Sequence, residues 1–379
     1  MTNSRKATSL EEKVAFLADA RHYRGRPRAV ETIETHFAWL FLVGERAYKL
    51  KKPLRQASMS YRTLALRERA CRAEVELNRR LAPGIYLRVV PLGRNAAGEL
   101  MRARGARVVD WLVEMVRLPA SRMLDQAILA GAIRPRDLHR LMTRLAAFFR
   151  YAKRRPMSDR DYLARLLQQV RRNAQELRAP DLALDPILVE EVICSQLGLL
   201  NEHAHLLAGR GARLLDGHGD LRPEHVFLGT RGAGACVIDC LEFDPDLRRL
   251  DPAEEISFLA LECRRLGATR VAADLIALYA RTTGDSAPQA LIHFYMSRRA
   301  AVRAQIAAWH LRDAAFARQS RQWRRHAHSY LADALRHIHR ARSLVVARSS
   351  RITREHSVRA AALPAQDTRP ALQAEVFDG

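Results

Sequence analysis

Cysteine, aromatic side chains and long apolar runs are scarce in this sequence. It has 5 cysteines among 379 residues, and aromatic residues make up 6% of the chain. The one close cysteine pair, Cys236 and Cys240, has a spacing that matches no zinc or thioredoxin motif. No apolar run approaches the roughly 18 residues of a membrane helix, and the N-terminus lacks the apolar core of a signal peptide. The sequence excludes a disulfide-stapled secreted scaffold and predicts a soluble, cytoplasmic protein without membrane insertion.

Two glycine-rich nucleotide motifs are also absent. G-x-G-x-x-G does not occur before residue 49, and G-x-x-x-x-G-K-[ST] occurs nowhere in the chain. These absences exclude a phosphate grip made by a glycine loop and a separate Walker-type site.

Positive charge, in contrast, is abundant. Lys and Arg number 64 against 41 Asp and Glu, which gives a formal net charge of +23. Such an excess predicts attraction to polyanions, whether nucleotides, nucleic acid or a membrane surface. The arginines are spread along nearly every predicted helix, a distribution typical of solvated helix faces. The charge alone therefore does not choose the partner.

The apolar periods predict two parts of different architecture. From about residue 120 onward the periods are helical, apart from one stretch between residues 214 and 243. The first third instead contains β-prone runs and a single long helical run. We expect strands at 29–33, 39–43, 47–51, 86–92 and 108–116, and a helix at 63–82.

The exceptional stretch combines a hairpin with acids and histidines. Residues 226–229 and 235–238 predict the two strands of the hairpin, and symmetric pairing sets His225 opposite Asp239. Together with Asp220 on the preceding loop, these groups can hold a divalent cation and leave one acid free as a base. That is a minimum set for phosphoryl transfer. The alternative is that Asp220 and the nearby His218 only cap and brace a turn.

The run HGDLRPEH at 218–225, followed by VID at 237–239, resembles the catalytic and metal-binding loops of the aminoglycoside phosphotransferase family. This family is the small-molecule branch of the protein-kinase-like fold. The resemblance implies that His218 braces the loop, that Asp220 is the base orienting the acceptor hydroxyl, and that Asp239 binds the metal bridging the nucleotide phosphates. It extends over about residues 28–345 through ETHFAWLFLVGERAYKLKKP, CRAEVELNRRLAP and FYMSRRAAVRAQIA. These segments are similar to an uncharacterised bacterial subgroup, some members of which carry an extra P-loop kinase domain.

One position departs from the family pattern. Where the family has asparagine as its second metal ligand, this sequence has His225. An imidazole can ligate a divalent ion but favours softer transition metals over Mg²⁺, which prefers oxygen. Weaker metal binding at one site, a preference for Mn²⁺ and a loss of activity therefore remain open.

The first lobe offers a lysine and a glutamate for the nucleotide. A kinase-like sheet carries a lysine that grips the α- and β-phosphates and is held by a helix glutamate. Lys49 fits the third strand, with Lys51 on the same face as the second choice. Glu74 is the helix partner because its helical neighbours are mostly apolar, so its carboxylate needs a cation. Glu76 lies among arginines and is expected at the surface.

Further nucleotide contacts are predicted on both sides of this lysine. In place of a glycine loop, Thr35 and His36 could donate hydrogen bonds to phosphate, although a simple hairpin connection is the equal alternative. Glu114 and Met115, followed by Val116, are the expected hinge whose backbone meets the adenine. Asp251 resembles the structural aspartate of the family, and capping of the next helix would explain it.

Together these features predict an α+β, bilobal protein-kinase-like fold. We expect an N-lobe of a small antiparallel β-sheet plus one helix and a mainly helical C-lobe with a catalytic-loop β-hairpin. The expected parts are an N-terminal extension, partly helical, at 1–27; the nucleotide-binding N-lobe at 28–116; the helical C-lobe at 117–347; and a disordered basic tail at 348–379.

The predicted function is an ATP- or GTP-dependent phosphotransferase that uses Mg²⁺ or Mn²⁺ and moves the γ-phosphoryl group to a hydroxyl of a small molecule. Its predicted partners are the nucleotide and this acceptor, and the sequence does not define the oligomer. The alternative is a catalytically impaired pseudokinase that binds a nucleotide or RNA, although no aromatic-rich basic motif of the RNA-recognition type occurs. A protein kinase is disfavoured because no activation loop ending in A-P-E follows Asp239.

Overall fold

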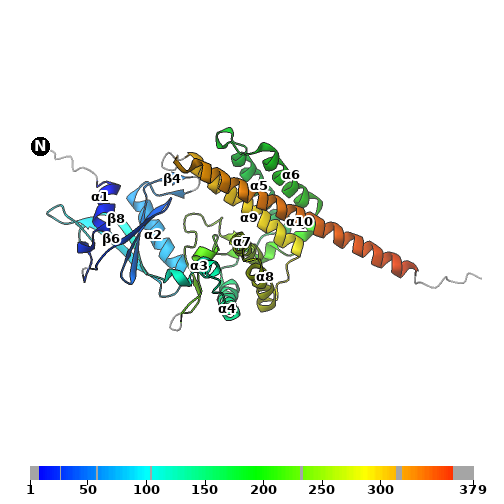
Figure 1. Cartoon of the computed structure of the whole chain (residues 1–379), viewed down its shortest axis with the longest axis horizontal. Coiled ribbons are helices and arrows are strands. Elements are labelled where there is room, and N and C mark those ends of the chain that lie inside the picture. Colours follow the sequence, from blue (N-terminus) through cyan, green and yellow to red (C-terminus); the bar gives the residue numbers. More distant parts are fainter. Residues whose placement is uncertain are drawn as a thin grey trace, which may run out of the picture.

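The computed structural model describes residues 8–25, 27–56, 59–102, 105–230, 234–312 and 318–361. The described chain forms two lobes, a sheet-containing lobe built from the first third and a larger helical lobe (Figure 1). The two lobes meet where helix α2 (Leu64–Arg79) and the loops around the short hairpin β10–β11 (Val226–Phe227 and Cys236–Val237) approach each other.

The N-lobe is an antiparallel sheet whose strand order, 1-2-3-8-6-7, places β8 between β3 and β6. A separate small ribbon, β4–β5 (Arg55–Gln56 and Met59–Ser60), follows β3 in sequence. The strands of the main sheet are β1 (Glu31–Glu34), β2 (Ala38–Val43), β3 (Arg46–Lys51), β8 (Arg107–Val116), β6 (Tyr86–Arg94) and β7 (Leu100–Met101).

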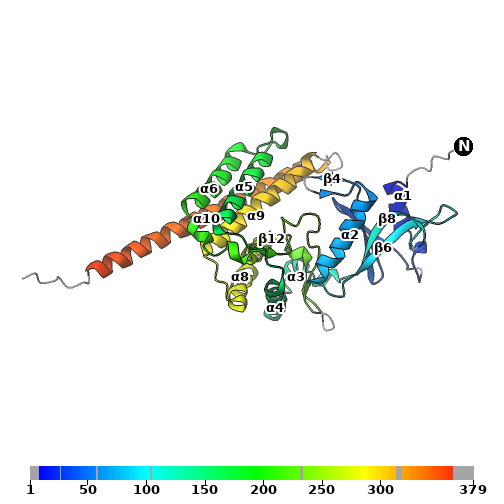
Figure 2. The same ribbon diagram turned by 180° about the vertical axis from the view of Figure 1, so that it is seen from behind.

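Strand alternation gives this sheet two apolar faces. On β3, Ala47 packs with Cys71 and Val75 of α2, which lies along one face of the sheet (Figure 2). The alternate residues Tyr48 and Leu50 face the other side, where they pack with Leu17 of α1 (Leu10–Ala18). Because side chains alternate along a strand, Lys49 and Lys51 must then point toward α2. A short 3₁₀ turn, η1 (Ala20–His22), follows α1.

Helix α2 begins with a side-chain cap and buries one stripe. The Thr63 hydroxyl accepts a hydrogen bond from the backbone N–H of Leu66, which satisfies one of the free donors of the first turn. Residues 70, 71, 74, 75 and 78 are buried at the helical spacing of three and four. Glu74 lies in the middle of this stripe, while Glu76 is exposed as predicted.

The C-lobe is a helical assembly with one continuous apolar core. In α4, for example, leucine, methionine and phenylalanine at three- and four-residue spacing are buried together. Its helices are α3 (Leu124–Leu129), α4 (Pro135–Tyr151), α5 (Asp159–Leu177), α6 (Pro186–Glu202), α7 (Pro252–Arg265), α8 (Thr269–Thr283), α9 (Gln289–Trp309) and α10 (Ser320–Ala361), with 3₁₀ turns η2 (Ala120–Arg122), η3 (Pro180–Leu182), η4 (Ala204–Leu207), η5 (Gly211–Arg213), η6 (Pro223–His225) and η7 (His310–Arg312).

Two short antiparallel strand pairs shape the loops that face the N-lobe. In β10–β11, Val226 pairs with Val237, so the predicted symmetric register, 226 opposite 238, was wrong by one residue. The Leu228 N–H donates to the Arg122 carbonyl, and Phe227 pairs with Met123, so contacts with the preceding segment help to set this register. The second pair is β9–β12 (Leu215–Asp216 and Arg249–Leu250). The loop tip at 231–233 lies outside the described residues.

The predicted disorder from residue 348 was wrong for its first part, because helix α10 continues to Ala361. Residues 348–361 contain neither glycine nor proline, the two residues that most disfavour helix, and include four arginines, which favour it. Residues 362–379 lie outside the described chain. Over the part of the chain that the structure describes, none of the helices combines the length and apolarity that crossing a bilayer requires.

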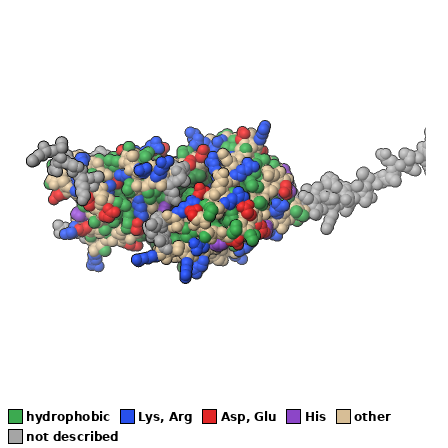
Figure 3. All heavy atoms as spheres, turned by 90° about the horizontal axis from the view of Figure 1, so that it is seen from above, with side chains coloured by type: hydrophobic (Ala, Val, Ile, Leu, Met, Phe, Trp, Pro, Cys, Tyr) green, Lys and Arg blue, Asp and Glu red, His purple; other side chains and the backbone are tan. Residues whose placement is uncertain are grey.

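This architecture is the α+β, bilobal protein-kinase-like fold that the sequence predicts. Positive charge is not gathered into one block on the face that Figure 3 shows. There, Lys and Arg side chains are interspersed with acidic and apolar ones.

Candidate active site

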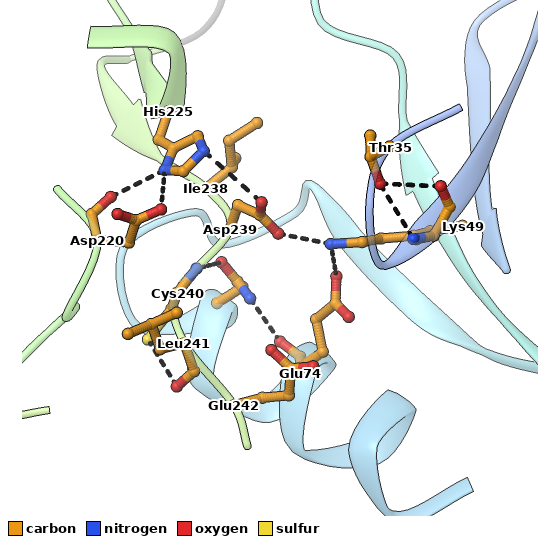
Figure 4. Close-up of polar contacts among 12 residues, drawn as sticks. Thr35, Lys49, Glu74, Asp220, His225, Ile238, Asp239, Cys240, Leu241 and Glu242 are labelled. Carbon is orange, nitrogen blue, oxygen red and sulfur yellow. Dashed lines mark hydrogen bonds and ion pairs between the residues drawn. The ribbon is translucent and has the colours of Figure 1, made fainter. Parts of the chain in front are cut away.

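A lysine between two carboxylates lies where the lobes meet (Figure 4). The Nζ atom of Lys49 is 2.9 Å from Oε1 of Glu74 on α2 and 2.5 Å from Oδ1 of Asp239, in the loop after β11. Burial lowers the pKa of Lys49, but the charges of Asp239 and Glu74 outweigh it and raise the pKa well above its usual range. Lys49 is therefore a fixed positive charge that connects the sheet, α2 and the C-lobe loop.

Lys51, the second choice from the sequence, forms a parallel set of contacts. Its Nζ atom lies 2.5 Å from Oε2 of Glu74 and 2.5 Å from Oε1 of Glu242. Tyr61 donates a hydrogen bond to the same oxygen of Glu242. Lys51 is almost fully buried, whereas Lys49 retains some exposure. The two lysines thus share Glu74, and the more accessible one is beside Asp239.

The backbone around Asp239 is held by two N-lobe side chains. Asp239 has a positive φ of 62°, which aspartate tolerates better than most residues. Its N–H donates to the Tyr86 hydroxyl at 3.0 Å, and the N–H of Cys240 donates to Oδ1 of Asn78 at 2.9 Å. The Asp239 side chain remains 42% exposed, so its carboxylate is accessible as well as oriented.

Hydrogen bonds of His218 and Glu255 hold the loop that carries Asp220. His218 Nε2 lies 2.9 Å from the Ile238 carbonyl, so this nitrogen carries the proton, and Nδ1 accepts from the Asp220 N–H at 3.3 Å. Burial, helped by the neighbouring His225, lowers the pKa of His218 to about 3. The carboxylate of Glu255 on α7 accepts the N–H groups of His218 and Gly219 at 2.8 and 2.6 Å. These contacts hold the loop without using the carboxylate of Asp220.

Asp220 itself is surrounded by positive charge. Burial raises its pKa, but the charges of Arg222, His225 and Arg303 outweigh this effect and bring the pKa down to about 2. The Arg222 Nε atom lies 3.1 Å from the carboxylate. Asp220 is therefore an ionised carboxylate at neutral pH, able to accept a hydrogen bond from a hydroxyl group.

His225 lies between the two aspartates. Its Nδ1 atom is 2.8 Å from the Asp220 carbonyl oxygen and 3.6 Å from Oδ2 of the same residue. Its Nε2 atom is 3.6 Å from Oδ2 of Asp239 and 3.3 Å from Nη2 of Arg222. The structure thus brings His225 beside Asp239 despite the shifted hairpin register.

Thr35 and His36, the predicted phosphate contacts, lie in the turn between β1 and β2. The hydroxyl of Thr35 lies 2.8 Å from the Ala38 carbonyl and accepts the Ala38 N–H, and its own N–H also donates to Ala38. Both polar groups therefore close the β1–β2 turn (Figure 4). The ring of His36 packs 4.9 Å from that of His310 in η7, so it faces the C-lobe helices.

The predicted hinge residues lie near the end of β8. Glu114 and Met115 are paired with β3 on one side and β6 on the other, so they lie within the sheet. The Glu114 carboxylate accepts from Arg88 at 2.7 Å. The N–H groups of Val116 and Arg117 still donate to backbone carbonyls, of Ile85 and Glu45 respectively. The backbone N–H groups of residues 116 and 117 are therefore already paired within the structure.

Sequence reasoning missed three residues of the site: Arg222, Glu242 and Glu255. Residues 239–255 form an acidic segment with seven Asp and Glu residues, and the sequence pattern does not single out Glu242 among them. Arg222 lies inside the motif that was used to find Asp220, and its position two residues after that acid was a signal. Asp251 behaves as expected: its side chain accepts the Ala253 N–H at 3.0 Å and caps α7.

The residues around Asp239 fit one divalent ion shared with phosphate. Among the described residues, no three His, Cys, Asp or Glu side chains come together as a complete metal site. The exposed carboxylate of Asp239 supplies the hard oxygen ligands that Mg²⁺ prefers, and phosphate oxygens commonly complete such sites. Asp239 would hold such an ion, whereas His225 already contacts a cation through Nε2.

The structure brings together a lysine on the third strand and a helix glutamate, and both face the loops that carry Asp220 and Asp239. This is the arrangement that the resemblance to the aminoglycoside phosphotransferase family implies for a protein-kinase-like fold.

The sequence matches no protein-family model. It is similar to three curated mycobacterial proteins, described as uncharacterized: Rv2004c and MT2060 of Mycobacterium tuberculosis and Mb2027c of Mycobacterium bovis. Each is 33% identical over 284 residues, which cover 73% of this chain and 54% of the relative. The chain therefore spans about half the length of the curated relatives it matches.

Solved structures of small-molecule kinases are similar over most of the chain. A choline/ethanolamine kinase family protein from Mesorhizobium loti has a TM-score of 0.48 and 14% identity, covering 86% of this chain and 98% of that one. A thermostable mutant of aminoglycoside phosphotransferase APH(4)-Ia has a TM-score of 0.44 and 14% identity, with coverage of 80% and 94%. Glucosamine kinase in complex with glucosamine, ADP and inorganic phosphate has a TM-score of 0.41 and 14% identity, with coverage of 87% and 84%.

Proposed function

We propose that this protein transfers the γ-phosphoryl group of ATP or GTP to a hydroxyl group of a small molecule. The observation that carries the proposal is the contact of Lys49 with both Glu74 and Asp239. Phosphoryl transfer depends chiefly on positioning and charge stabilisation, and this contact fixes a cation beside an accessible carboxylate.

Lys49 and Asp239 are the proposed nucleotide contacts. The ammonium group of Lys49 would exchange its contact with Asp239 for one with the phosphates. Glu74 would keep the ammonium group oriented during this exchange. A divalent ion at Asp239, Mg²⁺ or Mn²⁺, would neutralise the phosphate charge. Because the carboxylate of Asp239 is 42% exposed, it can bind such an ion without rearrangement of the buried loop behind it.

Asp220 is the proposed base. Its carboxylate would accept a hydrogen bond from the acceptor hydroxyl and align that oxygen with the γ-phosphorus. In the transfer, the bond from this oxygen to phosphorus forms and the bond from phosphorus to the β–γ bridging oxygen breaks. The hydroxyl proton goes to Asp220, and the nucleoside diphosphate leaves. A low pKa for Asp220 suits this role, because a loose transition state needs little proton abstraction before the phosphoryl group moves.

The proposal is tested by thermal stabilisation. ATP and GTP, each with Mg²⁺ or Mn²⁺, should raise the melting temperature of the wild type by several degrees, since a ligand that binds only the native state stabilises it. Asp239→Ala should lose the metal-dependent part of the rise. Asp246→Ala, an exposed acid of the same acidic segment, is the matched control and should keep it.

A second variant separates binding from chemistry. Asp220→Asn should retain the nucleotide-dependent rise and lose turnover once an acceptor has been found by screening metabolites. If no nucleotide raises the melting temperature with either metal, the kinase proposal fails. RNA binding with a steep dependence on salt would then favour the alternative function.

A further inference from the structure

The proton of His225 can be placed from its contacts. Nδ1 lies 2.8 Å from the backbone carbonyl of Asp220, and a carbonyl oxygen only accepts hydrogen bonds. Nδ1 therefore carries the proton and donates it. The other nitrogen, Nε2, lies 3.3 Å from Nη2 of Arg222, which can only donate. Nε2 is thus the acceptor in this contact, and its lone pair is directed at a guanidinium group.

This arrangement does not fit a metal ion on His225. A metal ligand must present the lone pair of Nε2, which is the pair that Arg222 uses. A guanidinium and a divalent cation on the same lone pair exclude each other, sterically and by charge. One oxygen of Asp239 is 2.5 Å from Lys49, and its 42% exposed carboxylate stays open to the single ion that is bound with the nucleotide.

Arg222 is well held at this position. Its Nε atom is 3.1 Å from the carboxylate of Asp220, the proposed base, and Nη1 forms an ion pair with Glu224. The Arg222 side chain is 15% exposed, so its guanidinium is largely shielded from solvent but not sealed from it. A planar guanidinium offers several N–H donors in a fixed fork and suits the oxygens of a phosphoryl group better than an ammonium does.

We propose that Arg222 takes the place of a second metal ion: its guanidinium, held by Nε2 of His225, binds the transferring phosphoryl group, and the site uses one divalent ion with the nucleotide. This inference rests on the proposed phosphotransferase function. It also explains the histidine at this position. An asparagine at this position would offer its amide oxygen to a metal ion. His225 instead uses the lone pair of Nε2 to accept a hydrogen bond from Arg222.

The number of bound metal ions tests the inference without any need for turnover. Mn²⁺ is titrated by electron paramagnetic resonance into protein saturated with AMP-PCP or with the corresponding GTP analogue, whose phosphate chains contain no nitrogen. Electron spin echo modulation then reports whether an imidazole nitrogen coordinates the ion. The wild type should bind one Mn²⁺ per chain and show no imidazole coupling. Two ions, or an imidazole coupling, would overturn the inference.

Two variants sharpen the test. Arg222→Gln removes the cation and frees Nε2, so a second ion or an imidazole coupling should appear; if neither does in the folded, nucleotide-bound variant, the inference is wrong. Arg222→Lys keeps a cation and should stay at one ion. Arg72→Gln, an exposed arginine on α2 that pairs with Glu68, is the matched control and should behave as the wild type.

The failure of this inference can be told apart from the failure of the proposed function. Nucleotide binding is measured on the same samples by equilibrium dialysis. Bound nucleotide with two ions contradicts only the role of Arg222, whereas no bound nucleotide contradicts the kinase proposal and the inference with it.

Discussion

Lys51 and Glu242 join the two lobes, with Nζ of the lysine 2.5 Å from Oε1 of the glutamate. Lys51 belongs to the third strand of the N-lobe sheet, and Glu242 to the C-lobe loop three residues after Asp239. The same Nζ atom lies 2.5 Å from Oε2 of Glu74. Burial lowers the pKa of Lys51, but the charges of Glu242 and Glu74 outweigh it and raise the pKa well above its usual range. The loop that presents Asp239 is therefore anchored by a permanent charge.

Replacing Lys51 should cost stability. Lys51→Met leaves the carboxylate of Glu242 without its buried cation and leaves Glu74 with Lys49 alone, and breaking a buried ion pair in this way costs about 3–5 kcal/mol. Urea denaturation should show a lower midpoint with an unchanged slope. Lys52→Met, which removes the partner of the half-exposed Glu34, is the matched control and should change stability much less. Equal losses in the two variants would contradict the anchoring role.

The Lys49→Met variant should separate function from stability. Glu74 keeps Lys51, and Asp239 is 42% exposed, so water can solvate the acid that loses its partner. The loss of stability should therefore be smaller than for Lys51→Met. The stabilisation by nucleotide and metal should disappear, because the ammonium beside Asp239 is gone. Thermal melts of both variants with and without nucleotide make the comparison, and a full nucleotide response in Lys49→Met would exclude Lys49 as the phosphate contact.

Lys49 and Lys51 show which contacts of the site could be predicted from the sequence. Strand alternation puts Lys49 and Lys51 on one face, and the apolar neighbours of Glu74 mark it as their buried partner. Which lysine meets Asp239 depends on how the C-lobe loop docks on the sheet. That docking depends on the positive φ of Asp239 and on hydrogen bonds that the loop backbone donates to Tyr86 and Asn78, which lie far away in the chain.

The sequence could not show which backbone and side-chain groups stay free at the β1–β2 turn and at the end of β8, for a similar reason. Thr35 was read as a phosphate donor, but threonine hydroxyls also bond to nearby backbone groups, and this one closes its own turn. Glu114 and Met115 lie in a strand that the apolar pattern predicted well, while the end of the ladder depends on pairing with both neighbours. Element type follows from local pattern, whereas exact ends and free backbone groups follow from tertiary pairing.

Arg210 and Asp251 form a buried ion pair at the start of α7, the helix that carries Glu255. Arg210 Nε lies 2.7 Å from Oδ2 of Asp251, which also accepts from the Tyr295 hydroxyl at 2.7 Å. Asp251→Asn keeps the size of the side chain but removes one of the two carboxylates that pair with Arg210, the other being Asp285, so we expect a loss of about 1–3 kcal/mol in urea denaturation. Asp181→Asn, at an exposed pair with Arg312, is the control and should leave the midpoint nearly unchanged. A midpoint for Asp251→Asn equal to that of the control would show that the buried charge is dispensable.

Glu255 should make the stability depend on pH. Burial raises its pKa from the ordinary 4.5 to about 7, although it accepts hydrogen bonds from the N–H groups of Gly219 and His218. Between these two values the native state holds a proton that the unfolded chain has lost. The resulting stabilisation is complete below about pH 4.5 and is lost as the pH rises through 7, by about 3 kcal/mol in all.

The Glu255→Gln variant isolates this contribution. Glutamine keeps an oxygen that can accept both N–H groups, but it has no proton to lose. The free energy of unfolding of the variant should therefore lack the decrease that deprotonation of Glu255 causes in the wild type. Urea denaturation at several values between pH 4.5 and 8 should therefore give a wild-type curve that drops relative to the variant as the pH rises. Glu76→Gln, on the exposed face of α2, should follow the wild type. Parallel curves for the wild type and Glu255→Gln would mean that Glu255 is ionised throughout, and that the catalytic loop rests on a buried carboxylate rather than on a carboxylic acid.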